Sequence, residues 1–189
     1  MRRQLATAAA AFATVLSLAA CEAEVTATPD KPAAAGDEKP GKGAEQAEEK
    51  DPVAKVGDAI TLTGFDDEKI EVTVVKVVDP AKSKDEFIVP DDGNRWLGVQ
   101  VQLVNKGEKA YQDSPTNGMQ VADADGQMFQ TTFGEITAGP ALSSDVRLAP
   151  GAKALGWVTF DVPKGVTVTQ VQVALNSGMA DQTGQWKLK

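Results

Sequence analysis

The stretch RWLGVQVQLVN, residues 95–105, decides the fold class of this 189-residue chain. Leucine or valine occupies positions 97, 99, 101 and 103, whereas glycine or glutamine occupies positions 98, 100 and 102. A period of two places alternate side chains on opposite faces, so the stretch predicts a β-strand with one buried face. The following Asn105-Lys106-Gly107 predicts a turn in which Gly107 takes a positive backbone angle.

Shorter segments on both sides show a similar pattern of β-branched residues between turn residues. Asp125-Gly126 predicts a hairpin, and the dense run of valines at 74–78 predicts a strand covered on both faces or bent at a bulge. Residues 80–90 lack alternation, and we expect a loop with a helical turn there. Strands are predicted at residues 59–63, 70–79, 119–124, 127–133, 155–162, 168–175 and 185–188.

Seven or eight short strands within residues 53–189, with no useful segment of helical period, predict an all-β fold built as an antiparallel sandwich of two sheets. A domain of this length buries about two thirds of its unfolded surface and needs no disulfide. The predicted core contains Ile60, Leu62, Val72, Val74, Leu97, Val99, Val101, Leu103, Val158, Phe160, Val171, Val173 and Leu175.

The N-terminal residues 1–20 have the three parts of an export signal: a basic start, an apolar middle and small residues before a cut. Leu18-Ala19-Ala20-Cys21 resembles the lipobox of bacterial lipoproteins, which implies cleavage between Ala20 and Cys21 and a lipid on the Cys21 thiol. Cys21 is the only cysteine of the chain and has no disulfide partner within it. These features predict attachment to the outer face of a bacterial cell membrane. Sec and twin-arginine export both stay open.

Composition excludes several kinds of function. The chain contains no histidine, so neither a Ser-His-Asp triad nor a His-ligated metal site can form. Without residues 1–20, 17 basic residues oppose 27 acidic ones, a net charge of -10 that disfavours nucleic acid as a partner. No cofactor is indicated.

Residues 21–52, between the predicted cleavage point and the first strand, are rich in Ala, Glu, Lys, Gly and Pro. Such a segment buries too little apolar surface to offset its ordering entropy, so we expect a disordered acidic linker. The predicted domains are therefore a signal peptide at 1–20, a lipidated linker at 21–52 and a β-sandwich at 53–189.

Several motifs together resemble a bacterial family. They are Val56-Gly57-Asp58, the alternating stretch that begins at Trp96, Leu148-x-Pro150-Gly151 and Gly156-x-Val158-x-Phe160-x-Val162-Pro163-x-Gly165. The family is a telokin-like, immunoglobulin-like domain of unknown function, found on exported lipoproteins and similar in fold to a secreted mycobacterial immunoprotective antigen. This resemblance implies an immunoglobulin-like sandwich and provides no catalytic residues.

Three acidic turns contain carboxylates that could act as calcium ligands. Asp123-x-Asp125-Gly126 lacks carboxylates at the other positions of a calcium loop, so it is better explained as a hairpin turn. The clusters Asp66-Asp67-Glu68 and Asp91-Asp92-Gly93 are interpreted as solvated turns, and no metal site is predicted, although calcium binding there stays open.

Sulfur and aromatic side chains are interpreted as structural. Met119 and Met128 lie in predicted strands, and they are expected to fill the core rather than to join Met179 in a copper site. Trp96 and Trp157 also lie in predicted strands, so we expect them to cap the sandwich core rather than to form a sugar-stacking platform with Trp186.

Two long loops are the best candidates for function: residues 106–118, with Tyr111, and residues 134–147. Simple surface connections are an equally good interpretation of both. The leading hypothesis is a non-enzymatic, lipid-anchored interaction module whose partner is another exported protein or a wall component. One alternative is an envelope hydrolase with a carboxylate pair among Asp113, Asp123, Glu135 and Asp145. Another is a solute-binding or sensory lipoprotein.

Overall fold

The computed structural model describes residues 53–188. The predicted signal peptide, the Ala20–Cys21 cleavage point, the lipidation of Cys21 and the linker at 21–52 lie outside the described residues, and they stay predictions. No helix in residues 53–188 is long and apolar enough to span a bilayer.

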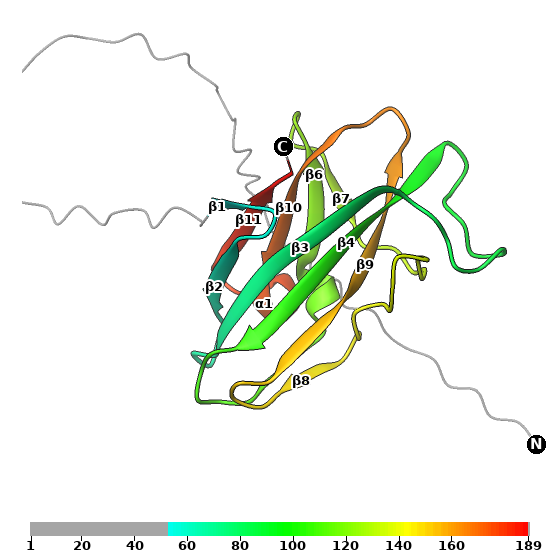
Figure 1. Ribbon diagram of the computed structural model, residues 1–189. Helices are drawn as coiled ribbons and strands as arrows, with labels where there is room; N and C mark the ends of the chain where they lie inside the picture. The colour runs from blue at the N-terminus through cyan, green and yellow to red at the C-terminus, as the bar shows by residue number, and fades with distance from the viewer. Residues whose placement is uncertain (1–52, 189) are drawn as a thin grey trace, which may run out of the picture. The chain divides into compact units, whose positions relative to one another are not determined.

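Two β-sheets form the domain (Figure 1), and the predicted all-β sandwich is confirmed. The four-stranded sheet has the order β2 (Ala59–Thr63), β3 (Lys69–Ala81), β4 (Asn94–Asn105) and β9 (Lys153–Pro163). The five-stranded sheet has the order β1 (Val53–Lys55), β11 (Thr183–Lys187), β10 (Val168–Ala174), β6 (Met119–Asp123) and β7 (Met128–Gln130). A small third sheet pairs β5 (Tyr111–Asp113) with β8 (Val146–Leu148). The remaining elements are the 3-10 turn η1 (Pro115–Gly118) and the single turn α1 (Leu175–Gly178).

The core lies between the two large sheets and contains all thirteen residues predicted from the alternation. The alternating stretch forms β4, which lies between β3 and β9, so its inward leucines and valines are fully covered. Because the strand period is two, the even-numbered residues of β4 point to the opposite, outer face.

Three local features differ from the predictions or sharpen them. Strand β1 pairs in parallel with β11, so one edge of the sandwich is not antiparallel. Strand β3 shifts register between Val74 and Lys76, which confirms a bulge as the reason for its apolar run. The prediction that Gly107 takes a positive φ is wrong. A glycine suits this position because a Cβ there would lie 3.1 Å from the backbone nitrogen of Lys69.

The segment at 80–90 differs in two ways from the predicted loop with a helical turn. Strand β3 continues to Ala81, and no helical turn is present between residues 82 and 92. The loop that begins at 82 instead pairs with residues 135–137, because the backbone nitrogen of Lys84 donates to the carbonyl of Glu135 at 2.9 Å. This contact brings two long loops together beside β9.

Candidate binding groove

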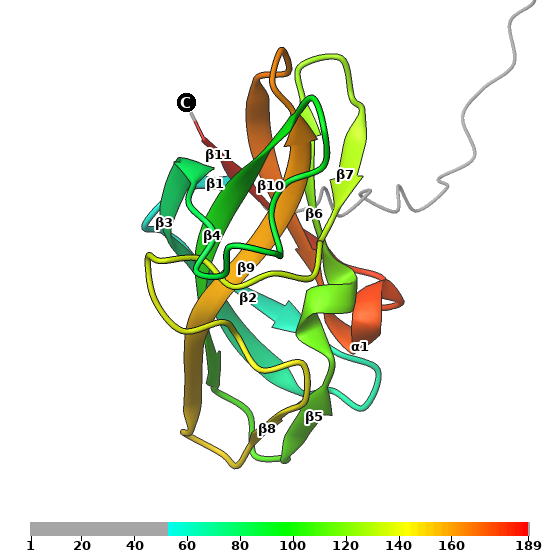
Figure 2. The same cartoon turned by 90° about the vertical axis from the view of Figure 1, so that its right-hand side faces the viewer.

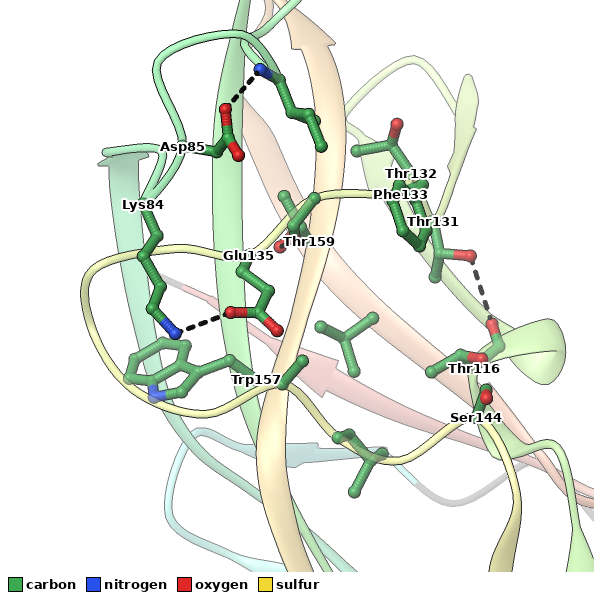
Figure 3. A pocket seen from close by; sticks show the side chains of 15 residues that line it. Lys84, Asp85, Thr116, Thr131, Thr132, Phe133, Glu135, Ser144, Trp157 and Thr159 are labelled. Carbon is green, nitrogen blue, oxygen red and sulfur yellow. Dashed lines mark hydrogen bonds and ion pairs between the residues drawn. The ribbon is translucent and has the colours of Figure 1, made fainter.

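A groove of about 640 Å³ lies beside β9, bounded by the loop at 82–92, the loop at 131–145 and η1 (Figure 3). Its size is within the range of ligand-binding sites in proteins. Figure 2 shows the yellow loop at 131–145 crossing β9. The loop at 82–92 contributes Lys84, Asp85 and Ile88, and η1 contributes Thr116. The remaining lining comes from residues 131–135, 141–142, 144 and 157–159.

Backbone hydrogen bonds hold the loop at 131–145 against the edge of β9. The nitrogen of Thr132 donates to the carbonyl of Thr159, and the nitrogen of Leu142 donates to the carbonyl of Trp157, both at 2.8 Å. Gly156 permits this close approach, since a Cβ on it would lie 2.4 Å from the Cα of Leu142. The loop therefore pairs with β9 at residues 157–160 and forms a fixed wall of the groove.

The opposite loop, 82–92, is fixed by its own polar side chains. The Ser83 hydroxyl lies 2.6 Å from the carbonyls of both Asp85 and Ile88. Asp85 Oδ1 accepts hydrogen bonds from the backbone nitrogens of Phe87, at 2.7 Å, and Ile88, at 3.3 Å. These bonds order the loop before any ligand arrives, which lowers the entropy cost of binding.

Apolar side chains are exposed on both loops of this ordered groove, and two of them, Ile88 and Phe133, line it. Phe133 is 87% exposed and Phe87 is 85% exposed, and Ile88 and Val89 beside Phe87 are also exposed. Such a concentration of exposed apolar side chains, on loops held by internal hydrogen bonds, is typical of an interaction site.

The polar groups of the groove suit binding better than chemistry. Lys84 Nζ lies 2.8 Å from Glu135 Oε2 (Figure 3), and this hydrogen bond raises the pKa of Lys84 above its ordinary value. Thr159 donates its hydroxyl proton to the carbonyl of Gly134 at 2.9 Å. The hydroxyls of Thr132 and Ser144 also line the groove.

The four carboxylates proposed as catalytic pairs lie on β5, on β6 and, for Glu135 and Asp145, ten residues apart in the loop at 131–145. Each of them has a different partner among residues 53–188. Asp113 accepts hydrogen bonds from Tyr111 and Ser177. Asp123 stabilises its hairpin by accepting from the nitrogens at 125 and 127. Glu135 pairs with Lys84, and Asp145 with Arg147. Each has a local structural partner, which does not favour the carboxylate-pair hydrolase.

Among residues 53–188, no three acidic side chains converge in a way that could hold a metal ion. In the cluster at 66–68, Glu68 turns back to accept a hydrogen bond from the backbone nitrogen of Asp66 at 2.9 Å. The cluster at 91–93 borders a second hollow of about 330 Å³, together with Arg95, Trp96 and Lys164.

The three tryptophans are all at least nine-tenths buried, so they form no exposed platform. Trp186 belongs to the main core, and its indole nitrogen donates to the carbonyl of Asp58 at 2.9 Å. The prediction that Trp96 and Trp157 cap that core is wrong. They pack with Ala81 and Ile136 on the outer face of the four-stranded sheet, which the loop at 131–145 covers.

The three methionines considered in the sequence differ in their burial. Met119 is buried in the main core as predicted, but Met128 is 45% exposed on β7, so the prediction that it fills the core is wrong. Met179 is exposed beyond α1. Met128 is exposed because β7 is the short outer strand of its sheet.

Both segments predicted as candidate loops contribute to the groove, and each also contains a short strand or part of one. Residues 106–118 contain β5 and supply Thr116 from η1, while residues 134–147 supply one wall and the start of β8. Tyr111 itself is buried and does not line the groove. The loop at 82–92 was predicted as a loop but not as a candidate for function, although Phe87-Ile88-Val89 next to charged residues was a usable signal.

The fold and the groove define a β-sandwich domain with a groove on one side. Residues 63–183 match the family described as Domain of unknown function (DUF4352), and the chain belongs to this family. No curated protein matches it.

Solved structures of bacterial proteins share the fold. MPT63, a secreted protein from Mycobacterium tuberculosis, is 21% identical with a TM-score of 0.51, and the match covers 72% of this chain and 97% of MPT63. The yjhA protein from Bacillus subtilis is 19% identical with a TM-score of 0.51, covering 72% and 99%. The ycdA protein of Bacillus subtilis, provisionally assigned as a lipoprotein, is 16% identical with a TM-score of 0.52, and the match covers 72% of this chain but 39% of ycdA. At these identities the likeness concerns the fold alone.

Proposed function

We propose that this protein is an exported, lipid-anchored interaction module that performs no catalysis and binds another protein through the groove beside β9. The observation that carries the proposal is the pair of ordered loops that expose Phe133, which lines the groove, and Phe87, the neighbour in sequence of the groove-lining Ile88. Exposed aromatic anchors around a recess are typical of the residues that dominate protein–protein binding energies.

Export and anchoring are supported by the basic start, the apolar middle and the lipobox-like Leu18-Ala19-Ala20-Cys21. They are also supported by two proteins of similar fold, one named as secreted and one provisionally assigned as a lipoprotein. A diacylglycerol on Cys21 would hold the chain at the outer face of the cell membrane, since each buried methylene contributes ~0.8 kcal/mol. The linker at 21–52 would then let the domain reach partners away from the bilayer.

A binding role is favoured over the alternatives by the groove's own groups. The charges of Lys84 and Glu135 in the groove neutralise each other. Among the described residues that line the groove, no hydroxyl is hydrogen-bonded to a side chain that could act as its base. A solute-capturing lipoprotein would bury most of its ligand's surface, whereas this groove is open to solvent along the side of the sandwich.

Site-specific photo-cross-linking in intact cells tests the proposal. A benzoylphenylalanine replaces Phe87 or Phe133 in the full-length protein, and Val53, exposed on β1 at the far edge of its sheet, is the matched control position. We expect the same exported protein to be captured from positions 87 and 133 and not from position 53. Equal capture from all three positions, or none from the groove positions, would contradict the proposal.

A further inference from the structure

We infer that the groove receives a peptide segment in which an apolar side chain is flanked by lysine or arginine. This inference rests on the proposed function and adds the chemistry of the partner. It is drawn from the loop tip at residues 87–89 and from the four carboxylates that flank it, Asp85, Glu86, Asp91 and Asp92, called here the acidic flank.

The apolar component follows from the loop tip and the lining behind it. Phe87, Ile88 and Val89 are exposed in a loop whose backbone is already fixed, and Ile88 also lines the groove with Leu142. An apolar side chain of a partner that covered the tip and entered the groove would remove these surfaces from water at no cost in loop ordering.

The basic component follows from charge. All four residues of the acidic flank are exposed, and none of them forms an ion pair within residues 53–188. Two lysines occur in the same loop, and one of them, Lys84, is already neutralised by Glu135. Lys82 and Lys164, which borders the same hollow as Asp91 and Asp92, offset part of this charge, while Arg95 beside them is already paired with Asp79. Four carboxylates against two lysines leave the loop tip in a net negative field, and cationic residues beside the partner's apolar anchor would complement it.

A peptide fits these observations better than a wall glycan. Neutral sugars would gain nothing from the acidic flank, and phosphorylated wall polymers would be repelled by it. The hydroxyls of Thr132 and Ser144 provide both donors and acceptors along the groove, which suit the amide groups of an extended backbone.

Selection from a random peptide library tests the inference, with the full-length protein in detergent as bait. We expect enriched peptides to share an aromatic or branched aliphatic residue with Lys or Arg within a few positions. Their affinity should fall several-fold when sodium chloride rises from about 50 to about 300 mM, because salt screens exposed charges. Phe87→Ser should weaken binding by at least about tenfold, and the double change Asp91→Asn with Asp92→Asn should weaken it by about two- to fivefold, because these charges are exposed.

Val53→Ser is the matched control, because it also removes an exposed apolar side chain but lies at the far edge of the sheet; its affinity should be unchanged. Enriched peptides without basic residues, binding that ignores salt and both groove variants, or preferential binding of purified wall glycan would each overturn the inference. If the library yields no binder while positions 87 and 133 still cross-link to a protein in cells, the peptide chemistry is wrong and the interaction module stands. If the cross-links also fail, both proposals fall.

Discussion

Tyr111 is the only tyrosine of the chain, so the ultraviolet absorbance of tyrosinate reports the ionisation of this residue without contributions from other tyrosines. Its side chain is 1% exposed, and its hydroxyl donates a hydrogen bond to Asp113 Oδ2 at 2.8 Å. Burial, followed by the negative charge of Asp113, raises the pKa of Tyr111 far above its ordinary value. We expect no tyrosinate to form while the domain stays folded.

The raised pKa also predicts how stability changes with pH. An unfolded tyrosine ionises near pH ~10, whereas the folded side chain stays neutral, so the contribution is complete below that pH and is lost as pH rises. The free energy of unfolding should fall by about 1.4 kcal/mol per pH unit above ~10 from this residue alone, or about 2.7 kcal/mol by pH ~12. Absorbance and circular dichroism recorded on the same samples should show tyrosinate appearing only together with unfolding.

Asp113→Asn separates the two causes. The substitution removes the neighbouring charge but not the burial, so the pKa of Tyr111 should fall towards 10 without reaching it. Reversible ionisation of the unmodified protein near pH ~10, with native circular dichroism retained, would refute this explanation.

Three further predictions concern the fold, the groove and the anchor. The fully buried Asn105 makes three side-chain hydrogen bonds, so Asn105→Ala should lower the free energy of unfolding by about 3 kcal/mol in urea titrations. The exposed Gln112→Ala should change it by less than about 0.5 kcal/mol, and equal effects would contradict the assignment. Gly156→Ala should displace the groove wall, reduce stability by about 1–3 kcal/mol and abolish cross-linking, whereas Gly165→Ala, which meets no atom within 4 Å, should be neutral. Cys21→Ser should release the protein from the membrane or block its processing, as measured by cell fractionation, and unchanged retention would exclude the lipid anchor.

Strong local periodicity made the centre of the fold predictable from sequence. The alternation in 95–105 identified the faces of β4, and Asp125-Gly126 identified the β6–β7 hairpin, where Gly126 has a positive φ. Strands β1, β5 and β8 were not predicted, because three residues are too few to show a period.

The surroundings of the outer face could not be predicted, because they depend on pairing between segments distant in sequence. The loop at 131–145 pairs with β9 and covers Trp96 and Trp157, so a face that alternation alone would leave half-solvated is buried. The groove arises from the same pairing, together with the contact between Lys84 and Glu135. Residues 134–147, which belong to one wall of the groove, were therefore predicted as a candidate for function, whereas the opposite loop at 82–92 was not.

Hydrogen–deuterium exchange tests the central claim most directly, with the full-length protein compared free and bound to the partner that photo-cross-linking identifies. We predict slowed exchange in residues 84–89 and 131–144, with little change in β1 and β11. Protection concentrated on β1 and β11, with none along the groove, would contradict the account.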